Sequence, residues 1–354
     1  MGIIYFVVLL GVIVTIHELG HFIAAKLFRV YCGEFSIGMG PKLFSIQGKE
    51  TKYSIRLFPM GGYVAMAGDV ENALEETVKV DVPKERTVKG IAHWKQIVIM
   101  LAGILMNFVL AICLFTGIVM SQGVTTSLDV PQVGTIIEES PADLAGFQVG
   151  DRVIRIDYAN GKSIEPQTFS EMSAANLGLE SVVRYYTLDR DGSQIVIEVT
   201  PQFYVASNAY LIGINAPVVV EFPPIFESVK IAVNQMFSIS GLVFGGLADL
   251  FRGKNLDQLS GPIGIYTVTK EQASLGLVNY VWLIALLSLN VGIFNSLPLP
   301  ILDGGRAILV MIEFVRGKPI NQKLEQGMMT FGLIAMMVLF IISTWQDIVR
   351  LFLK

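Results

Sequence analysis

The chain has 354 residues, of which 53% are hydrophobic and 16% are charged, and its mean hydropathy is +0.59. A soluble domain usually carries about 25% charged residues, so this composition indicates an integral membrane protein. A net charge of -4 without a long basic tract argues against nucleic-acid binding. The two cysteines, Cys32 and Cys113, are too few for a disulfide framework, so other interactions must hold the fold together.

Four apolar segments are long enough to cross a bilayer, which takes about 20 residues. They cover residues 3–25, 97–120, 277–297 and 327–345. We expect the first to be a retained span and not a signal peptide, because it has no basic n-region. Residues 231–250 are also apolar, but Asn234, Gln235 and Asp249 interrupt them, which favours amphipathic helices at the membrane interface. The predicted fold is therefore a polytopic α-helical membrane protein with four transmembrane helices.

Two β-rich insertions separate the spans. Between the first two spans, alternating segments flank Gly48-Lys49-Glu50, which predicts a β-hairpin at about 42–66 that ends near Pro59, Gly61 and Gly62. The charged residues 69–90 predict a solvated loop. Strands are predicted at 133–137, 152–157, 182–188 and 194–200, together with a helix that starts at Pro141. This second insertion resembles the PDZ domains of bacterial proteases, a fold that binds peptides as an added strand.

The expected organisation follows from these segments in chain order. It comprises a first span (1–28), a cytoplasmic loop with the hairpin (29–95), a second span (96–122), a PDZ-like α+β domain (123–203), interfacial helices (204–275), a third span (276–305), a cytoplasmic loop (306–326), and a fourth span with the C-terminus (327–354).

The end of the first span reads His17-Glu18-Leu19-Gly20-His21. Helix positions i and i+4 share one face, so both imidazoles can bind one metal ion while Glu18 reaches a water beside it. Polar residues that simply end an apolar helix are the plain alternative. That alternative must also explain why two of the chain's three histidines stand at ligand spacing around a carboxylate. The pattern therefore predicts a zinc hydrolase motif within a membrane span.

A catalytic zinc generally takes three protein ligands. The soluble pattern would place a further Gly and His at positions occupied by Ala24 and Leu27, so the third ligand must come from elsewhere. We expect it to be Asp303, which follows two prolines that break the third span and precedes two glycines. A helix N-cap is the alternative role for this carboxylate.

The pairing of His17 with Asp303 constrains the topology. Both lie on one side of the membrane only if residues 231–250 do not form a span. The loops at 29–95 and 306–326 carry many Lys and Arg residues, which indicates that they are cytoplasmic. The PDZ-like domain and both termini are then expected to be extracytoplasmic, with the active site near the cytoplasmic side.

Six features, taken in order along the chain, resemble the bacterial site-2 proteases of the RseP/RasP type. They are HELGH at 17–21, GGYVAMAG at 61–68, AGILMN at 102–107, the single PDZ-like domain, LSGPIGI at 259–265 and NSLPLPILDGG at 295–305. The resemblance implies a zinc intramembrane protease of the bacterial cytoplasmic membrane. Its implied substrates are the transmembrane segments of single-span proteins already trimmed by another protease, such as anti-sigma factors or remnant signal peptides.

The resemblance also implies roles for individual residues. His17, His21 and Asp303 match the ligands of one Zn²⁺, Glu18 matches the catalytic base, and Asn295 matches a residue that holds the substrate backbone or the oxyanion. Asn107 matches the asparagine of the second span, and the hairpin end at Gly61, Gly62 and Tyr63 matches an element that presents the substrate as a strand.

One departure from the family pattern lies in the second span. The family often has a proline after the motif glycine, whereas here Gly103 is followed by Ile104 and Leu105, which puts a local kink in question. Three other functions stay open: a catalytically silent PDZ-bearing scaffold or chaperone, a metal transporter, and a metalloprotease that acts on water-exposed loops. The transporter is disfavoured because the chain lacks internal repeats and multiple acidic sites.

Overall fold

The computed structural model describes residues 1–68, 82–175, 181–204, 209–254 and 260–352. The chain forms two compact units, one made of Met1–Ser121 and Pro224–Lys354 and the other of Gln122–Pro223. Part of the expected solvated loop, residues 69–81, lies outside the described residues.

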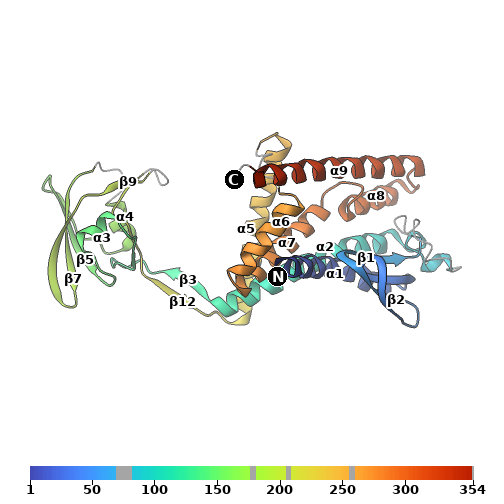
Figure 1. The fold of residues 1–354 in the computed structure, drawn as a ribbon, viewed down its shortest axis with the longest axis horizontal. Coiled ribbons are helices and arrows are strands. Elements are labelled where there is room, and N and C mark those ends of the chain that lie inside the picture. Colours follow the sequence, from blue (N-terminus) through green and yellow to red (C-terminus); the bar gives the residue numbers. More distant parts are fainter. Residues whose placement is uncertain (69–81, 176–180, 205–208, 255–259, 353–354) are drawn as a thin grey trace. The chain divides into compact units, whose positions relative to one another are not determined.

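The first unit contains the long helices and one β-hairpin (Figure 1). Its helices are α1 (Gly2–Leu27), α2 (His93–Gln122), α5 (Ile225–Phe251), α6 (Pro262–Ser274), α7 (Leu277–Asn295), α8 (Asp303–Arg316) and α9 (Gln322–Phe352). Among the described residues, five helices are long and apolar enough to cross a membrane, namely α1, α2, α5, α7 and α9. The chain is thus a helical protein with several candidate spans, and the expected count of four depends on where α5 lies.

Helix α5 is one continuous helix that packs on its neighbours along one side. Its residues Ala232, Met236, Ile239, Val243 and Leu247, spaced by three or four, join a core cluster with residues of α2 and α7. In Figure 1, α5 runs across the shared direction of α1, α2 and α9. The expected location of α5 along the membrane surface and the four-span count stay predictions.

Helices α1 and α2 are antiparallel and touch through small residues. A Cβ atom placed on Gly20 would lie 2.3 Å from the carbonyl oxygen of Ala102, so the two backbones approach as closely as glycine permits. Helix α2 is unbroken from His93 to Gln122, so Ile104 and Leu105 do not interrupt it. The close crossing holds the polar end of α1 against the middle of α2.

Strands β1 (Cys32–Gln47) and β2 (Lys52–Met66) form the hairpin. It begins ten residues earlier than the expected start at 42, because β1 is long enough to pair with β2 at two places. The pairing puts four segments side by side, in the order 44–47, 52–55, 34–37 and 62–65. The segment 62–65 is therefore at one edge of this small sheet.

The second unit is an α+β domain around a four-stranded sheet of order β6-β5-β7-β8. The elements are β3 (Val124–Ser127), β4 (Thr135–Ile136), α3 (Pro141–Ala145), β5 (Arg152–Tyr158), β6 (Ser163–Ile164), α4 (Phe169–Ala174), β7 (Arg184–Arg190), β8 (Ser193–Val199), β9 (Gln202–Tyr204), β10 (Ala209–Leu211), β11 (Ile214–Asn215) and β12 (Val218–Glu221). Phe147, Ile156, Met172, Tyr186 and Leu188 are in its core.

The second unit extends to Pro223 and not to the expected end at 203. The reason is that β10, β11 and β12 pair back with β9, β4 and β3. The interfacial helices expected over 204–275 therefore begin only at α5. The helix expected at Pro141 is α3, whose start is capped by the Ser140 side chain and whose end is Gly146 in a left-handed conformation.

Helix α8 occupies part of the segment that was expected to be a loop. It has Asp303 in its first turn, Arg316 in its last turn and Gly317 just beyond its end with a φ of 63°. These are ordinary start and stop signals, with charges that suit the helix dipole. The sequence therefore carries local signals for this helix, although its 14 residues are too few for a membrane span.

Candidate metal centre

Three side chains from distant parts of the chain meet inside the first unit. His17 and His21 lie one turn apart on α1, and Asp303 is the first residue of α8. Asp303 Oδ2 is 3.1 Å from His17 Nε2 and 3.2 Å from His21 Nε2, and the two Nε2 atoms are 3.3 Å apart. In the described part of the chain, these three side chains form a group that could hold a metal ion, because their ligand atoms all lie within 4.8 Å of one another.

The spacing of these atoms fits a small tetrahedral cation. Zinc binds nitrogen and oxygen ligands at about 2.0–2.1 Å, so tetrahedral ligand atoms lie about 3.3–3.4 Å from one another. Asp303 Oδ2 is buried and has no well-aligned hydrogen-bond partner among the described residues. Burying three lone-pair-bearing atoms against one another without a cation would cost free energy. This set of two imidazole nitrogens and one carboxylate oxygen therefore fits Zn²⁺.

The ring nitrogen of His21 that does not face Asp303, Nδ1, has a fixed hydrogen-bond partner. His21 Nδ1 is 2.8 Å from the carbonyl oxygen of Ile99, which can only accept a hydrogen bond. The proton is therefore on Nδ1, and the Nε2 lone pair faces Asp303 and His17. A backbone carbonyl that orients a metal-binding histidine in this way is a common second partner of metal sites.

Asn107 is the hydrogen-bond partner of the His17 ring nitrogen that does not face Asp303, Nδ1. The Asn107 side chain is fully buried, and its amide group is 3.1 Å from His17 Nδ1. Its Oδ1 atom has no hydrogen-bond partner in the described part of the chain. With the amide turned so that Oδ1 accepts from the Nδ1 proton, both groups are satisfied and His17 Nε2 is left unprotonated. The structure thus places Asn107 behind a histidine, where it can orient the ring.

The hairpin lies against Glu18. A Cβ atom on Gly62 would be 3.4 Å from Glu18 Cγ, so the edge segment of the sheet runs next to the carboxylate that follows His17. The neighbouring Gly61 has a φ of 111°, which a side chain rarely allows. Tyr63 is held by Arg56, which both bonds to its hydroxyl and lies over its ring.

The turn between α7 and α8 presents Asp303. Cβ atoms on Gly304 and Gly305 would lie 2.4 Å from the Ser296 carbonyl oxygen and 2.0 Å from the Leu299 carbonyl oxygen. The two glycines therefore let the turn fold tightly onto the start of α8. Asn295 is the last residue of α7, and its carbonyl oxygen would be 2.9 Å from the same Gly304 Cβ. Its backbone is thus near Asp303, while the role of its side chain stays a prediction.

Gly103 is a residue of the site that the sequence reasoning missed. A Cβ atom there would lie 2.3 Å from His21 Nε2 and 2.9 Å from His17 Cε1. Any side chain at this position would occupy the space where the ligand atoms converge. The motif AGILMN contains the signal, because a glycine in a span often marks close helix packing.

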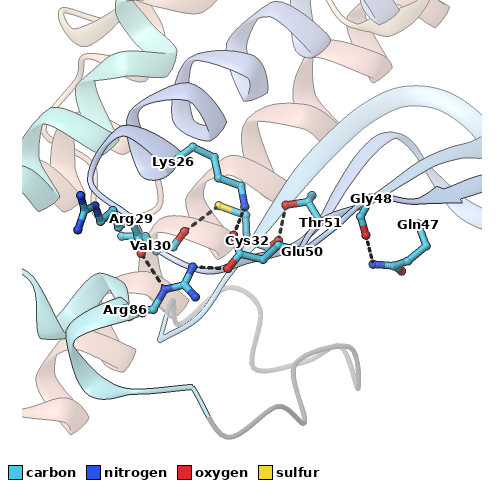
Figure 2. A network of polar contacts seen from close by, with 9 residues as sticks. All are labelled: Lys26, Arg29, Val30, Cys32, Gln47, Gly48, Glu50, Thr51 and Arg86. Atoms are coloured by element: carbon cyan, nitrogen blue, oxygen red, sulfur yellow. Dashed lines mark hydrogen bonds and ion pairs between the residues drawn. The ribbon is translucent and has the colours of Figure 1, made fainter.

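An ion-pair cluster fixes the turn of the hairpin to the end of α1 (Figure 2). Glu50 accepts a hydrogen bond of 2.6 Å from Lys26 and another from Arg86. The Lys26 bond lowers the pKa of Glu50, partial burial opposes it, and the Arg86 bond lowers it further. Cys32 lies beside this cluster, and burial raises the pKa of its thiol to about 11, which favours the protonated thiol at neutral pH.

The family of the chain follows from a comparison with known proteins. The family model described as peptidase family M50 matches residues 5–339. The chain belongs to peptidase family M50. The expected site-2 protease family is thereby confirmed, and so is the expectation of a peptidase.

This M50 peptidase is similar over its whole length to bacterial proteins. A protein of Clostridium acetobutylicum, whose name describes a zinc metalloprotease, is 36% identical over 340 residues, covering 96% of this chain and 95% of the relative. The zinc metalloprotease RasP of Bacillus licheniformis is 30% identical over 426 residues, covering 99% of each chain. A protein of Enterococcus faecalis named as the protease eep is also 30% identical over 426 residues, with 99% of each chain covered.

Proposed function

We propose that this M50 peptidase is a zinc-dependent intramembrane protease that cleaves the transmembrane segments of single-span membrane proteins. The convergence of His17, His21 and Asp303 beside Glu18 carries the proposal. Helix α1, which bears three of these residues, is apolar enough to cross a membrane. The zinc metalloprotease names of its relatives support the metal and the reaction class.

The proposed chemistry assigns a role to each residue. Bound zinc, held by His17, His21 and Asp303, would supply the Lewis acidity that makes water a competent nucleophile near neutral pH. Glu18 takes a proton from the attacking water and later delivers it to the leaving amine. Asn107 keeps the His17 ring in place, and Asn295 holds the substrate backbone or the developing oxyanion.

A transmembrane substrate must be unwound before it is cut, because its carbonyl groups are engaged in helical hydrogen bonds. We place the unwound segment along the hairpin edge at Gly61, Gly62 and Tyr63. The contact between Gly62 and Glu18 supports this placement, because a strand added there would pass the catalytic carboxylate. Helix-breaking residues in the substrate would then favour cleavage.

The proposed setting is the bacterial cytoplasmic membrane, with the lipid bilayer around a multi-pass chain. The basic residues of the loops at 29–95 and 306–326 support a cytoplasmic location for these loops and for the nearby site. The second unit and both termini are then extracytoplasmic. In this setting the PDZ-like unit either binds the tail of a pre-trimmed substrate or excludes large ones. Anti-sigma factors and remnant signal peptides are the proposed substrate types.

The decisive experiment replaces Glu18 with Gln, which keeps the shape of the side chain but cannot take the proton. Purified enzyme and a tagged single-span substrate are incubated in detergent, the zinc content is measured, and the cut site is mapped by mass spectrometry. We expect cleavage to fall by about a thousandfold or more, with zinc still bound and the wild-type cut inside the span.

A matched control is Glu85→Gln, which changes an exposed carboxylate of the turn Lys84–Arg86. It should cleave like the wild type. Undiminished cleavage by Glu18→Gln would rule out Glu18 as the base. Zinc binding by the wild type without cleavage of any tested span would favour the silent scaffold, and cuts outside the span would favour a loop-directed protease.

A further inference from the structure

The motif LSGPIGI has no role in the chemistry above, yet its glycines form a distinct structural feature. Gly261 is the residue before α6, and Pro262 begins the helix. Gly264 follows one turn later, so Gly261 and Gly264 lie on the same side of the helix start. Together they leave a notch at the positive end of the α6 dipole.

A carboxylate from another helix fills this notch. Asp347 of α9 is only 3% exposed, and its Oδ2 accepts a hydrogen bond of 2.8 Å from the backbone N–H of Gly264. Cβ atoms on Gly261 and Gly264 would lie 2.7 Å from Oδ2 and 2.8 Å from Oδ1. A side chain at either position would therefore displace the carboxylate. Buried acidic residues within membrane helices are rare and are retained for specific roles.

The two oxygens of the Asp347 carboxylate have different partners. Oδ1 has no hydrogen-bond partner in the described residues, but it forms a long ion pair of 3.9 Å with Arg350 of the same helix. The hydrogen bond to Gly264 is thus the contact that ties the carboxylate to another helix. Replacing it would leave a hole between two helices and remove the bond to Gly264.

Helix α9 touches the metal-bearing part of the unit at a second point. A Cβ atom on Gly332 would lie 3.3 Å from Ile301, which is two residues before Asp303. On its other side, α6 packs on α1, because Tyr266 stacks edge-on with Phe6 at 5.9 Å. The carboxylate therefore joins α9, which borders the Asp303 turn, to a helix that rests on the metal-bearing α1.

We propose that Asp347 is a positioning residue. Its contact with the N-terminus of α6, called the latch below, holds α9 against α6 and so fixes the position of α9 beside the metal centre. This inference rests on the proposed function, because α9 then forms one wall of the space that receives a transmembrane substrate. The latch acts on the capture of the substrate and not on metal binding. Its loss lets α9 move away from α6, so a substrate helix is held less well.

The test uses the full-length chain in four variants: Asp347→Ala, Asp347→Asn, Gly264→Ala, and the double variant of Asp347→Ala with Gly264→Ala. Gly327→Ala is the matched control, because this α9 glycine has open space around it. The measurements are KM and kcat for a single-span substrate, the zinc content, and the α6–α9 distance. Spin labels at the exposed Thr267 and Ile341 report that distance after Cys32 and Cys113 are replaced by Ala.

We expect Asp347→Ala and Gly264→Ala each to raise KM about tenfold and to broaden the α6–α9 distance distribution, with zinc content unchanged. The double variant should be no worse than either single one, because the alanine methyl occupies the space that the carboxylate leaves. Asp347→Asn should recover most of the wild-type KM, because its Oδ1 can still accept from Gly264.

Three results would overturn the latch: an unchanged KM and distance in Asp347→Ala, a double variant whose defects multiply, or loss of zinc from Asp347→Ala. These outcomes are separable from failure of the proposed function. If the wild type cleaves no span, the distance measurements still decide whether Asp347 holds α9 to α6.

Discussion

Gly103 lies directly against His21, so that a Cβ atom at position 103 would be 2.3 Å from His21 Nε2. The contact occurs where α2 crosses α1, and the same absent side chain would meet His17 at 2.9 Å. The candidate metal centre is thus shaped by a residue that offers it no ligand atom.

Gly103→Ala is expected to displace the His21 ring and to lower the zinc content and the cleavage rate together. The methyl group has no free volume, because both histidines border the same position. Metal analysis of the purified variant checks the prediction. Gly117→Ala on the same helix has open space and should keep its zinc. A fully zinc-loaded Gly103→Ala protein would contradict the packing argument.

Asn107→Ala is expected to weaken zinc binding without removing a ligand. The His17 ring loses the amide that orients it, and the loss of such outer partners typically costs about 10- to 100-fold in metal affinity. Competition with a chelator measures the change. Asn279→Ala, at an exposed position on α7, serves as the control. If Asn107→Ala kept its zinc affinity but bound substrate poorly, a direct substrate role for Asn107 would be favoured instead.

Glu50→Gln is expected to loosen the hairpin and to remove part of its pH dependence. Because the pKa of Glu50 is lower in the folded protein than its usual value of about 4.3, its stabilising effect is complete above that value. The effect is lost as the pH falls through the folded-state pKa. The pair with Lys26 is partly exposed, so the contribution is about 1 kcal/mol.

Hydrogen exchange over residues 47–52 checks this prediction at several pH values. In the wild type, protection should fall below about pH 4.3, whereas Glu50→Gln should be less protected at neutral pH and change less on acidification. Equal protection in both proteins at neutral pH would show that Glu50 does not hold the turn.

The two ends of α5 are expected to lie on the same side of the membrane. Single cysteines at Glu227 and Lys254, introduced in a chain without Cys32 and Cys113, should both react with an impermeant thiol reagent added from outside intact cells. The reason is that His17 and Asp303 belong to one site, which requires an even number of crossings between α1 and the α7–α8 turn. Labelling of only one end from outside would mean that α5 spans the membrane.

The sequence predicted much of this arrangement because its strongest signals are local. The spacing of His17 and His21 indicates that both lie on one helix face. The length of the apolar segments in α1, α2, α7 and α9 indicates candidate membrane spans. The limits of the second unit were harder to predict. Its last strands pair with β3 and β4, which lie far earlier in the chain.

By itself, the sequence determined the membrane character and the family of this chain and predicted the ligand types, because motif spacing and hydropathy are properties of neighbouring residues. Only the tertiary structure decided how distant groups meet the two histidines. The Ile99 carbonyl, Asn107 and Gly103 meet the histidines through the α1–α2 crossing, and Asp347 meets Gly264 through the packing of α9 on α6. Such contacts depend on how helices pack in space, and local periodicity carries no record of them.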